Sequence, residues 1–89
     1  MVQIVCSVLD VKANAFATPF FVPNRGMAVR FFGDAVLDPN SGLSKHPEDY
    51  NLYQLGTYDD NSGKLESLST PEFLAKALDF TTKGQTWKE

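Results

Sequence analysis

The sequence is poor in the residues that most often build metal and nucleophilic sites. It has one cysteine, Cys6, and one histidine, His46, in 89 residues. One cysteine allows no disulfide within the chain and no thiolate cluster, and one histidine excludes a metal site with two imidazoles in a single chain. Cys6 lies inside the apolar run VQIVCSVLDV, so we expect a buried thiol rather than a reactive one.

Long hydrophobic runs and a basic excess are also missing. No window approaches the 18 consecutive apolar residues of a membrane helix, and the start of the chain lacks the pattern of a signal peptide. Eight Lys and Arg against eleven Asp and Glu give a net charge of −3, whereas proteins that hold nucleic acid by counterion release usually carry a basic excess. We expect a protein of a reducing, cytosol-like compartment with no membrane partner. Non-specific duplex binding by the monomer is disfavoured; a local basic patch, a dimer or a protein partner stays open.

The common catalytic motifs are absent too. The sequence contains no GxxxxGK and no GxSxG. The turn at 59–63 resembles the start of a calcium loop, but its twelfth position is Thr70 rather than Glu. His46 beside Glu48 and Asp49 leaves open a metal shared across a dimer, although a solvated loop is the simpler interpretation. A chain of this length also builds only a small core, so the sequence predicts no enzyme and no cofactor.

What is present is a globular composition, 43% hydrophobic and 12% aromatic. Residues 2–11 alternate with apolar side chains on both faces, which predicts a central strand. Residues 12–23 hold two prolines and three phenylalanines, which favours an extended, buried connector or a short edge strand. Residues 50–58 and 64–68 flank a DDNSG turn and predict a β-hairpin.

Two helices are predicted. The first begins after an N-cap at Asn24 and runs to about Leu37, where Asp-Pro-Asn stops it. The second follows a Thr70 cap with Pro71 at its first position. A helical wheel predicts the following faces: a buried stripe of Ala28, Phe31, Phe32 and Ala35 on the first helix, an outward face of Gly26, Arg30, Gly33 and Asp34, and an apolar face of Phe73, Leu74, Ala77 and Leu78 on the second.

The order strand, connector, helix, hairpin, helix predicts the α+β class. We expect a small antiparallel sheet, made by the N-terminal strand and the hairpin, with two helices packed on one face. A single domain is predicted over residues 1–80, followed by a C-terminal tail at 81–89 whose one distinctive residue is Trp87.

Two surfaces are candidates for contact with nucleic acid or a partner. The start of the first helix offers free backbone amides and two arginines, which suits an anion; an ordinary cap with a solvated Arg25, and with Arg30 paired to Asp34, is the alternative. In the hairpin, Tyr50, Leu52 and Tyr58 are predicted to point inward, which leaves Tyr53 for stacking. The candidate contact residues are Asn24, Arg25, Gly26, Arg30, Gly33 and Tyr53.

Between about residues 8 and 66 the chain carries the ordered series PFF, PNR, AVR, DPN, HPEDY and LGTYDD followed by Gly. This series resembles the small nonstructural protein of gokushoviruses, single-stranded DNA phages of the microvirus group (Microviridae). The resemblance implies a protein of the infected bacterial cytoplasm. It also implies DNA binding and a role like that of the microvirus protein that switches replication towards single-strand synthesis and packaging.

Two functions follow as hypotheses. The first is an accessory protein of phage DNA replication or packaging that binds single-stranded DNA or the phage replication complex. The second is a homodimeric protein–protein adaptor or assembly factor without direct DNA contact, which would use the outward sheet face or the stripe of Gly26 and Gly33.

Overall fold

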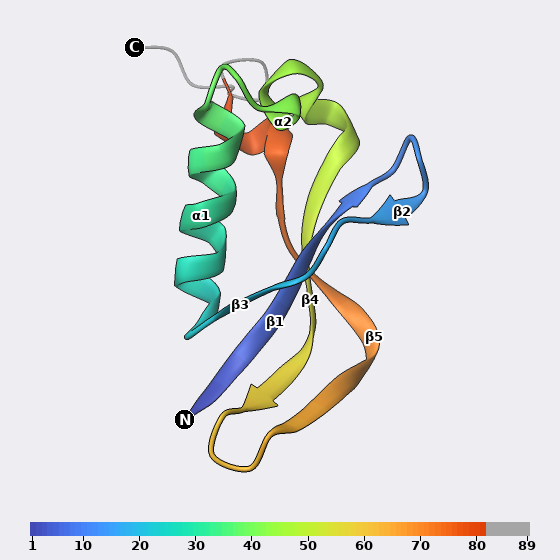
Figure 1. The fold of residues 1–89 in the computed structure, drawn as a ribbon. Coiled ribbons are helices and arrows are strands. Elements are labelled where there is room, and N and C mark those ends of the chain that lie inside the picture. Colours follow the sequence, from blue (N-terminus) through green and yellow to red (C-terminus); the bar gives the residue numbers. More distant parts are fainter. Residues whose placement is uncertain (82–89) are drawn as a thin grey trace.

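A computed structural model describes residues 1–81 of the chain. The residues 82–89, with Trp87 and almost all of the predicted tail, lie outside the described part. Figure 1 shows a curled antiparallel sheet beside one long helix. The elements in chain order are β1 (Val2–Asp10), β2 (Ala15–Phe16), β3 (Phe20–Val22), α1 (Arg25–Leu37), α2 (Gly42–Lys45), the 3-10 helix η1 (Pro47–Asp49), β4 (Tyr50–Asp59), β5 (Lys64–Lys76) and the 3-10 helix η2 (Ala77–Phe80).

The sheet is built around β1, as predicted. Its strand order is β2-β1-β4-β5, and β3 also pairs with β1. All pairings are antiparallel. The segment 12–23 supplies two short strands to one edge of β1, which confirms the second of the two alternatives, a short edge strand. Its burial is only partial: Val22 is buried, whereas Phe16 and Phe21 are exposed.

The predicted hairpin is confirmed, and its second strand is longer than expected. The turn closes with the Gly63 amide donating to the Asp59 carbonyl at 2.7 Å. Gly63 has a φ of 75°, a left-handed conformation that glycine adopts without the steric cost of a side chain. β5 then continues from Lys64 to Lys76.

The predicted second helix is wrong. Residues 70–76 stay in β5, and only the 3-10 turn η2 follows. The pairing register of β4 and β5 shows why no helix begins at Thr70 and Pro71. Gly56 pairs with Ser67 and Gln54 with Glu72, so four residues of β5, 68–71, bulge opposite one residue of β4. A proline inside a bulge removes no ladder hydrogen bond, so the strand passes through it.

The start of α1 follows the prediction. The Asn24 side chain accepts a hydrogen bond from the Met27 amide at 2.9 Å and so caps the helix. The helix then joins strands β1, β3 and β4 and the turn η2 in one hydrophobic core. This core consists of Cys6, Val22, Ala28, Phe32, Val36, Leu52 and Ala77.

The buried face of α1 differs from the predicted stripe. Ala28 and Phe32 are buried as expected, but Phe31 is 47% exposed. Gly33, predicted to face outward, is buried. The cause is Phe80: a Cβ at Gly33 would lie 2.8 Å from two ring carbons of Phe80, and the Phe80 ring also packs edge-on against Phe32 at 5.8 Å. The α+β class is confirmed, with α1 as the one helix longer than four residues between residues 1 and 81.

Candidate functional site: the aromatic face of the sheet

The pairing register assigns every strand residue to one of two sides of the sheet. Strand β1 alternates without a bulge, so Ile4, Cys6 and Val8 share one side and Val5 and Ser7 share the other. The first side carries the core and is here named the core side. The partners of each β1 residue lie on the same side as that residue.

The side opposite the core carries five aromatic rings. They face β1 residues of the Val5 and Ser7 side, directly or through β4. The phenylalanines among them are 42%, 47% and 49% exposed in chain order. We name this surface the aromatic face; its rings are Phe16 from β2, Phe21 from β3, Tyr53 and Tyr58 from β4, and Phe73 from β5.

The rings pack against one another edge to face. Tyr53 contacts Phe16 at a centroid distance of 5.7 Å and Phe73 at 5.8 Å. Phe21 contacts Tyr58 at 5.4 Å. Such contacts hold aromatic pairs in defined orientations and contribute about 0.5 to 1.5 kcal/mol each beyond the buried area. The face is therefore a set of oriented rings, of which the three phenylalanines expose nearly half of their surface and the two tyrosines less.

A bulge in β4 creates this arrangement. Val5 pairs with Gly56 and Cys6 with Gln54, so Leu55 is an extra residue. The extra residue reverses the alternation of the strand beyond it. The prediction that Tyr53 points outward and Leu52 inward is confirmed. The prediction that Tyr58 points inward is wrong, because the bulge turns it to the side of Tyr53. Tyr50, before the bulge, packs partly against the core as expected.

The β1 residues beneath the rings are buried. Val5 is 7% exposed and Ser7 is fully buried. The Ser7 hydroxyl donates to the Ala17 carbonyl at 2.6 Å, so this buried polar group is satisfied. A shallow hollow of about 160 Å³ lies beside Val5, lined also by Leu55, Gly56 and Leu65. The aromatic face is thus a surface for contact and not the mouth of a deep pocket.

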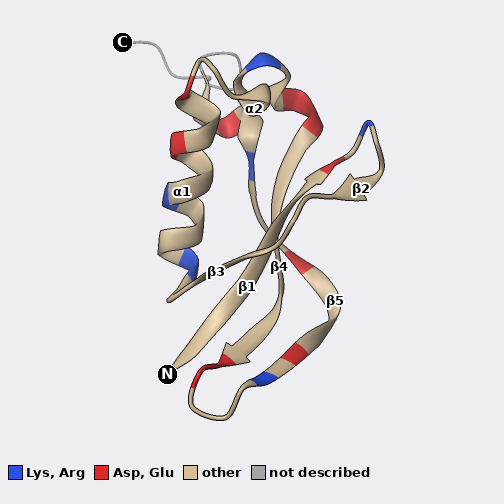
Figure 2. Ribbon diagram, viewed as in Figure 1, with Lys and Arg blue, Asp and Glu red and all other residues tan. Residues whose placement is uncertain are grey.

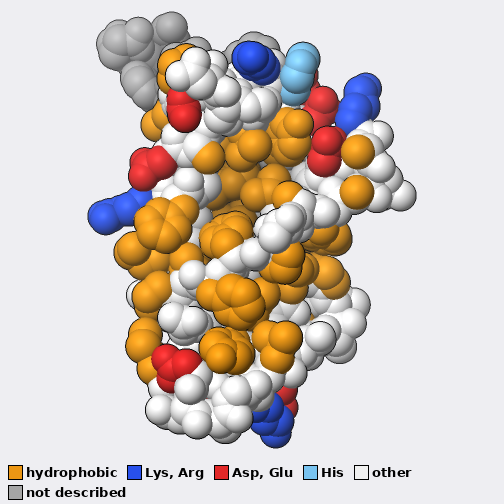
Figure 3. Space-filling view, viewed as in Figure 1, with side chains coloured by type: hydrophobic (Ala, Val, Ile, Leu, Met, Phe, Trp, Pro, Cys, Tyr) orange, Lys and Arg blue, Asp and Glu red, His pale blue; other side chains and the backbone are white. Residues whose placement is uncertain are grey.

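Charge is segregated between the two sides of the sheet. The acidic strand residues pair with β1 residues of the core side or with their partners; they are Asp10, Asp59, Glu66 and Glu72. The aromatic face carries no carboxylate among the strand residues, and Lys76 lies on it, in register with Asn51 and Leu9. Figure 2 shows the middle of β1 and β4 free of charge. In Figure 3 hydrophobic side chains occupy the centre of the view, and charged ones gather towards its periphery.

The residues predicted at the start of α1 do not form one open anion site. The Arg25 guanidinium donates from Nε to Gln54 Oε1 at 2.8 Å and from Nη2 to Glu72 Oε1 at 2.7 Å, so it ties the helix to β4 and β5. The Asn24 side chain is used by the cap, and Gly33 is buried under Phe80. The stripe of Gly26 and Gly33 is therefore not an open surface.

Gly26 and Arg30 remain at the surface of α1. A Cβ at Gly26 would meet only Asn24 Oδ1, at 3.3 Å. Arg30 is exposed, and between residues 1 and 81 the ion pairs within 4.0 Å do not include one between Arg30 and Asp34. The structure therefore places Tyr53, and not these α1 residues, among the rings of the aromatic face.

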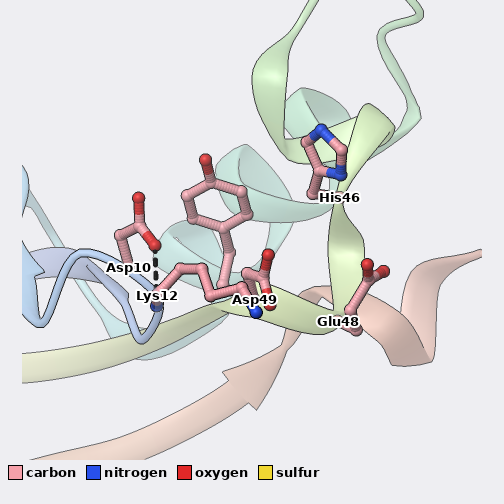
Figure 4. Close-up of a pocket in the computed structure, with 6 residues that line it drawn as sticks. Asp10, Lys12, His46, Glu48 and Asp49 are labelled. Carbon is pink, nitrogen blue, oxygen red and sulfur yellow. Dashed lines mark hydrogen bonds between the residues drawn. The ribbon is translucent and has the colours of Figure 1, made fainter.

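A cluster of polar side chains lies just before the start of β4. The ligand atoms of His46, Glu48 and Asp49 lie within 4.8 Å of one another. They line an open hollow of about 470 Å³ together with Asp10, Lys12 and Tyr50. Figure 4 shows the Lys12 side chain entering the same space. His46 and Glu48 are exposed and a lysine shares the hollow, so a solvated loop accounts for this cluster.

The cysteine behaves as the sequence predicts. Cys6 is fully buried in the core. Burial raises the pKa of the Cys6 thiol to about 11, although the positive charge of Arg25 acts to lower it. The neutral thiol is therefore an inert core group.

Comparison with known proteins assigns the chain to a family. The family model described as "Phage ORF5 protein" matches residues 3–80, from the second residue of β1 to the last of η2. The chain belongs to this family of phage ORF5 proteins. No curated protein and no solved structure gives a significant match.

Membership in the ORF5 family makes this a phage protein, of which the aromatic face is the most distinctive surface. Sequence reasoning found one of its five rings, Tyr53. The remaining rings depend on strand pairing that no local pattern reports. Within residues 1–81, no helix is long and apolar enough to span a membrane.

Proposed function

We propose that the protein is a nonstructural accessory protein of a single-stranded DNA phage that binds single-stranded DNA through its aromatic face. It acts in viral DNA replication, or in the switch to single-strand synthesis and packaging, in the host bacterial cytoplasm. Membership of a phage family and the resemblance to the gokushovirus nonstructural protein support the setting. The observation that carries the binding role is the set of five rings, three of them nearly half exposed, on a face whose strands carry no carboxylate.

The chemistry of this face favours single strands over duplex. Unstacked bases pack on aromatic side chains with a gain of about 1 to 3 kcal/mol per base, and this gain needs no sequence readout. A duplex keeps its bases stacked internally and presents phosphates, which call for a basic surface. The chain has a net charge of −3. Among the strand residues of its aromatic face, Lys76 is the one lysine. The role proposed is one of binding, without catalysis and without a cofactor.

Fluorescence anisotropy with a labelled oligothymidine of about 20 nucleotides tests this proposal. Replacing an exposed ring of the face, in Phe16→Ala or Phe73→Ala, should weaken binding by about 5- to 150-fold, the equivalent of 1 to 3 kcal/mol. Phe31→Ala is the matched control, because Phe31 is 47% exposed on α1, outside the aromatic face. Thermal melts establish that each variant is folded. Absence of binding at micromolar protein, or an equal loss in the Phe31 variant, would reject the proposal.

The same exposed rings favour one other function, a homodimeric adaptor. Exposed apolar patches also mark protein interfaces, and two copies would cover each other's rings. Size-exclusion chromatography with light scattering distinguishes the two functions. A dimer that dissociates in Phe73→Ala, together with no DNA binding by the wild type, would favour the adaptor.

A further inference from the structure

The rings of the aromatic face form two separate groups. Phe16, Tyr53 and Phe73 are linked by edge-to-face contacts and make the three-ring site. Phe21 and Tyr58 make the two-ring site. Among residues 1–81, the ring contacts join members of each group but do not join the groups to each other.

Along β4, the surface between Tyr53 and Tyr58 carries no ring; Phe21 of the two-ring site lies across β1, at the level of Gly56. This part of β4 consists of the bulged Leu55 and of Gly56, because Thr57 pairs with Ile4 of the core side. Gly56 lies against the backbone of β5 and projects no side chain. The shallow hollow of about 160 Å³ lies here. A DNA strand that crosses this part of β4 therefore finds no ring on which its bases can stack, and its path is open.

The spacing of the sites sets a length for the ligand. Tyr53 pairs with Ser7 and Tyr58 with Gln3, which are four residues apart on the unbulged β1, or roughly 13 Å at about 3.3 Å per residue. A stacked strand advances about 3.4 Å per nucleotide, as one strand of a duplex does, and an unstacked strand advances further. Reaching from one site to the other thus takes at most about four nucleotides, and occupying both takes at most about eight.

We infer that the aromatic face binds one DNA strand at two stacking sites, with an unstacked stretch of strand between them. This inference rests on the proposed function. Once the first site is filled, the connecting nucleotides hold the second set of bases at high effective concentration. Such linkage raises affinity by about 100- to 10,000-fold over either site alone when the connector matches the gap. Affinity should therefore rise in a step when the strand becomes long enough to reach both sites.

An oligothymidine series of 3, 5, 8 and 12 nucleotides tests the inference by calorimetry and anisotropy. Affinity should increase by at least about 100-fold between the 3-mer and the 8-mer, and by no more than a few-fold from 8 to 12. Phe21→Ala should remove this step while leaving the 3-mer affinity within about twofold, because a short strand keeps the three-ring site. Phe31→Ala should preserve both the step and the 3-mer affinity.

A second ligand probes the connector directly. An 8-mer whose two central nucleotides are abasic should bind within a few-fold of the intact 8-mer, whereas abasic nucleotides at both ends should remove most of the affinity. A smooth rise with length, combined with an equal cost for central and terminal abasic nucleotides, would overturn the two-site arrangement and leave single-strand binding intact. Failure of every oligonucleotide to bind would instead reject the proposed function itself.

Discussion

A close approach of β4 and β5 gives a sharp prediction at Gly56. A Cβ at this position would collide with the carbonyl oxygen of Glu66, and it would lie 3.1 Å from the Glu66 carbonyl carbon and from Ser67 Cα. All three are backbone atoms of the paired strand β5, so no side chain can rotate away. Gly56→Ala must push β4 and β5 apart next to the bulge that orients Tyr58.

The magnitude follows from the cost of overpacking. Forcing one extra methyl group into a tightly packed place costs about 1 to 3 kcal/mol. For a domain of this size each kcal/mol lowers the melting temperature by about 4 to 8 °C. A loss of about 2 kcal/mol should therefore lower the melting temperature of Gly56→Ala by about 8 to 16 °C.

Thermal and urea unfolding followed by circular dichroism measure this effect. Gly42→Ala is the control, because a Cβ there meets nothing within 4 Å and alanine is the better helix former. The control should be neutral or slightly stabilised. An unchanged melting temperature in Gly56→Ala would refute the close approach of β4 and β5 at this position.

Three further outcomes are expected. Raising the salt concentration from 50 to 200 mM should weaken oligothymidine binding only about threefold. Lys76 is the one lysine among the strand residues of the aromatic face, and each phosphate contact contributes about −0.7 to the slope of log affinity against log salt concentration. A loss of 100-fold or more in the same anisotropy titration would contradict stacking-dominated binding. The Cys6 thiol, whose pKa is raised to about 11 by burial, should resist Ellman's reagent at pH 8 until urea unfolds the protein, and rapid native labelling would show that the core is open. Arg25→Ala should destabilise the protein in urea titrations by about 1 to 3 kcal/mol, since it leaves the buried Gln54 oxygen without its donor, whereas Glu72→Ala breaks only a half-exposed ion pair and should cost less than about 1 kcal/mol.

The sequence predicted the elements whose signals are local. The apolar alternation of β1, the Asn24 cap and the DDNSG turn each act within a few residues, and the structure confirms all three. The helix-start pattern at Thr70 and Pro71 is equally local, yet it failed. β5 pairs with β4 at eight residue pairs, which outweighs an isolated helix cap. Pro71 lies in a bulge, so its missing amide hydrogen removes no hydrogen bond from the strand.

The remaining errors come from contacts between distant residues. Gly33 was placed outward by its position on the helical wheel, but Phe80, which lies 47 positions later, covers it. That contact exists because β5 carries the chain past α1 before η2 turns. Tyr58 was placed inward by simple alternation, which the bulge at Leu55 reverses. The candidate site was therefore predictable only at Tyr53.

The bulge at residues 68–71 has a consequence for solubility. β5 is the last strand in the order β2-β1-β4-β5, so its outer edge offers unpaired backbone groups to other chains. Long, flat and apolar edges template aggregation between molecules. Here Pro71 removes a donor and the bulge interrupts the line of the strand, while Lys64, Glu66 and Glu72 place charges along it. The outer edge of β5 is therefore a poor template for pairing between the sheets of two molecules.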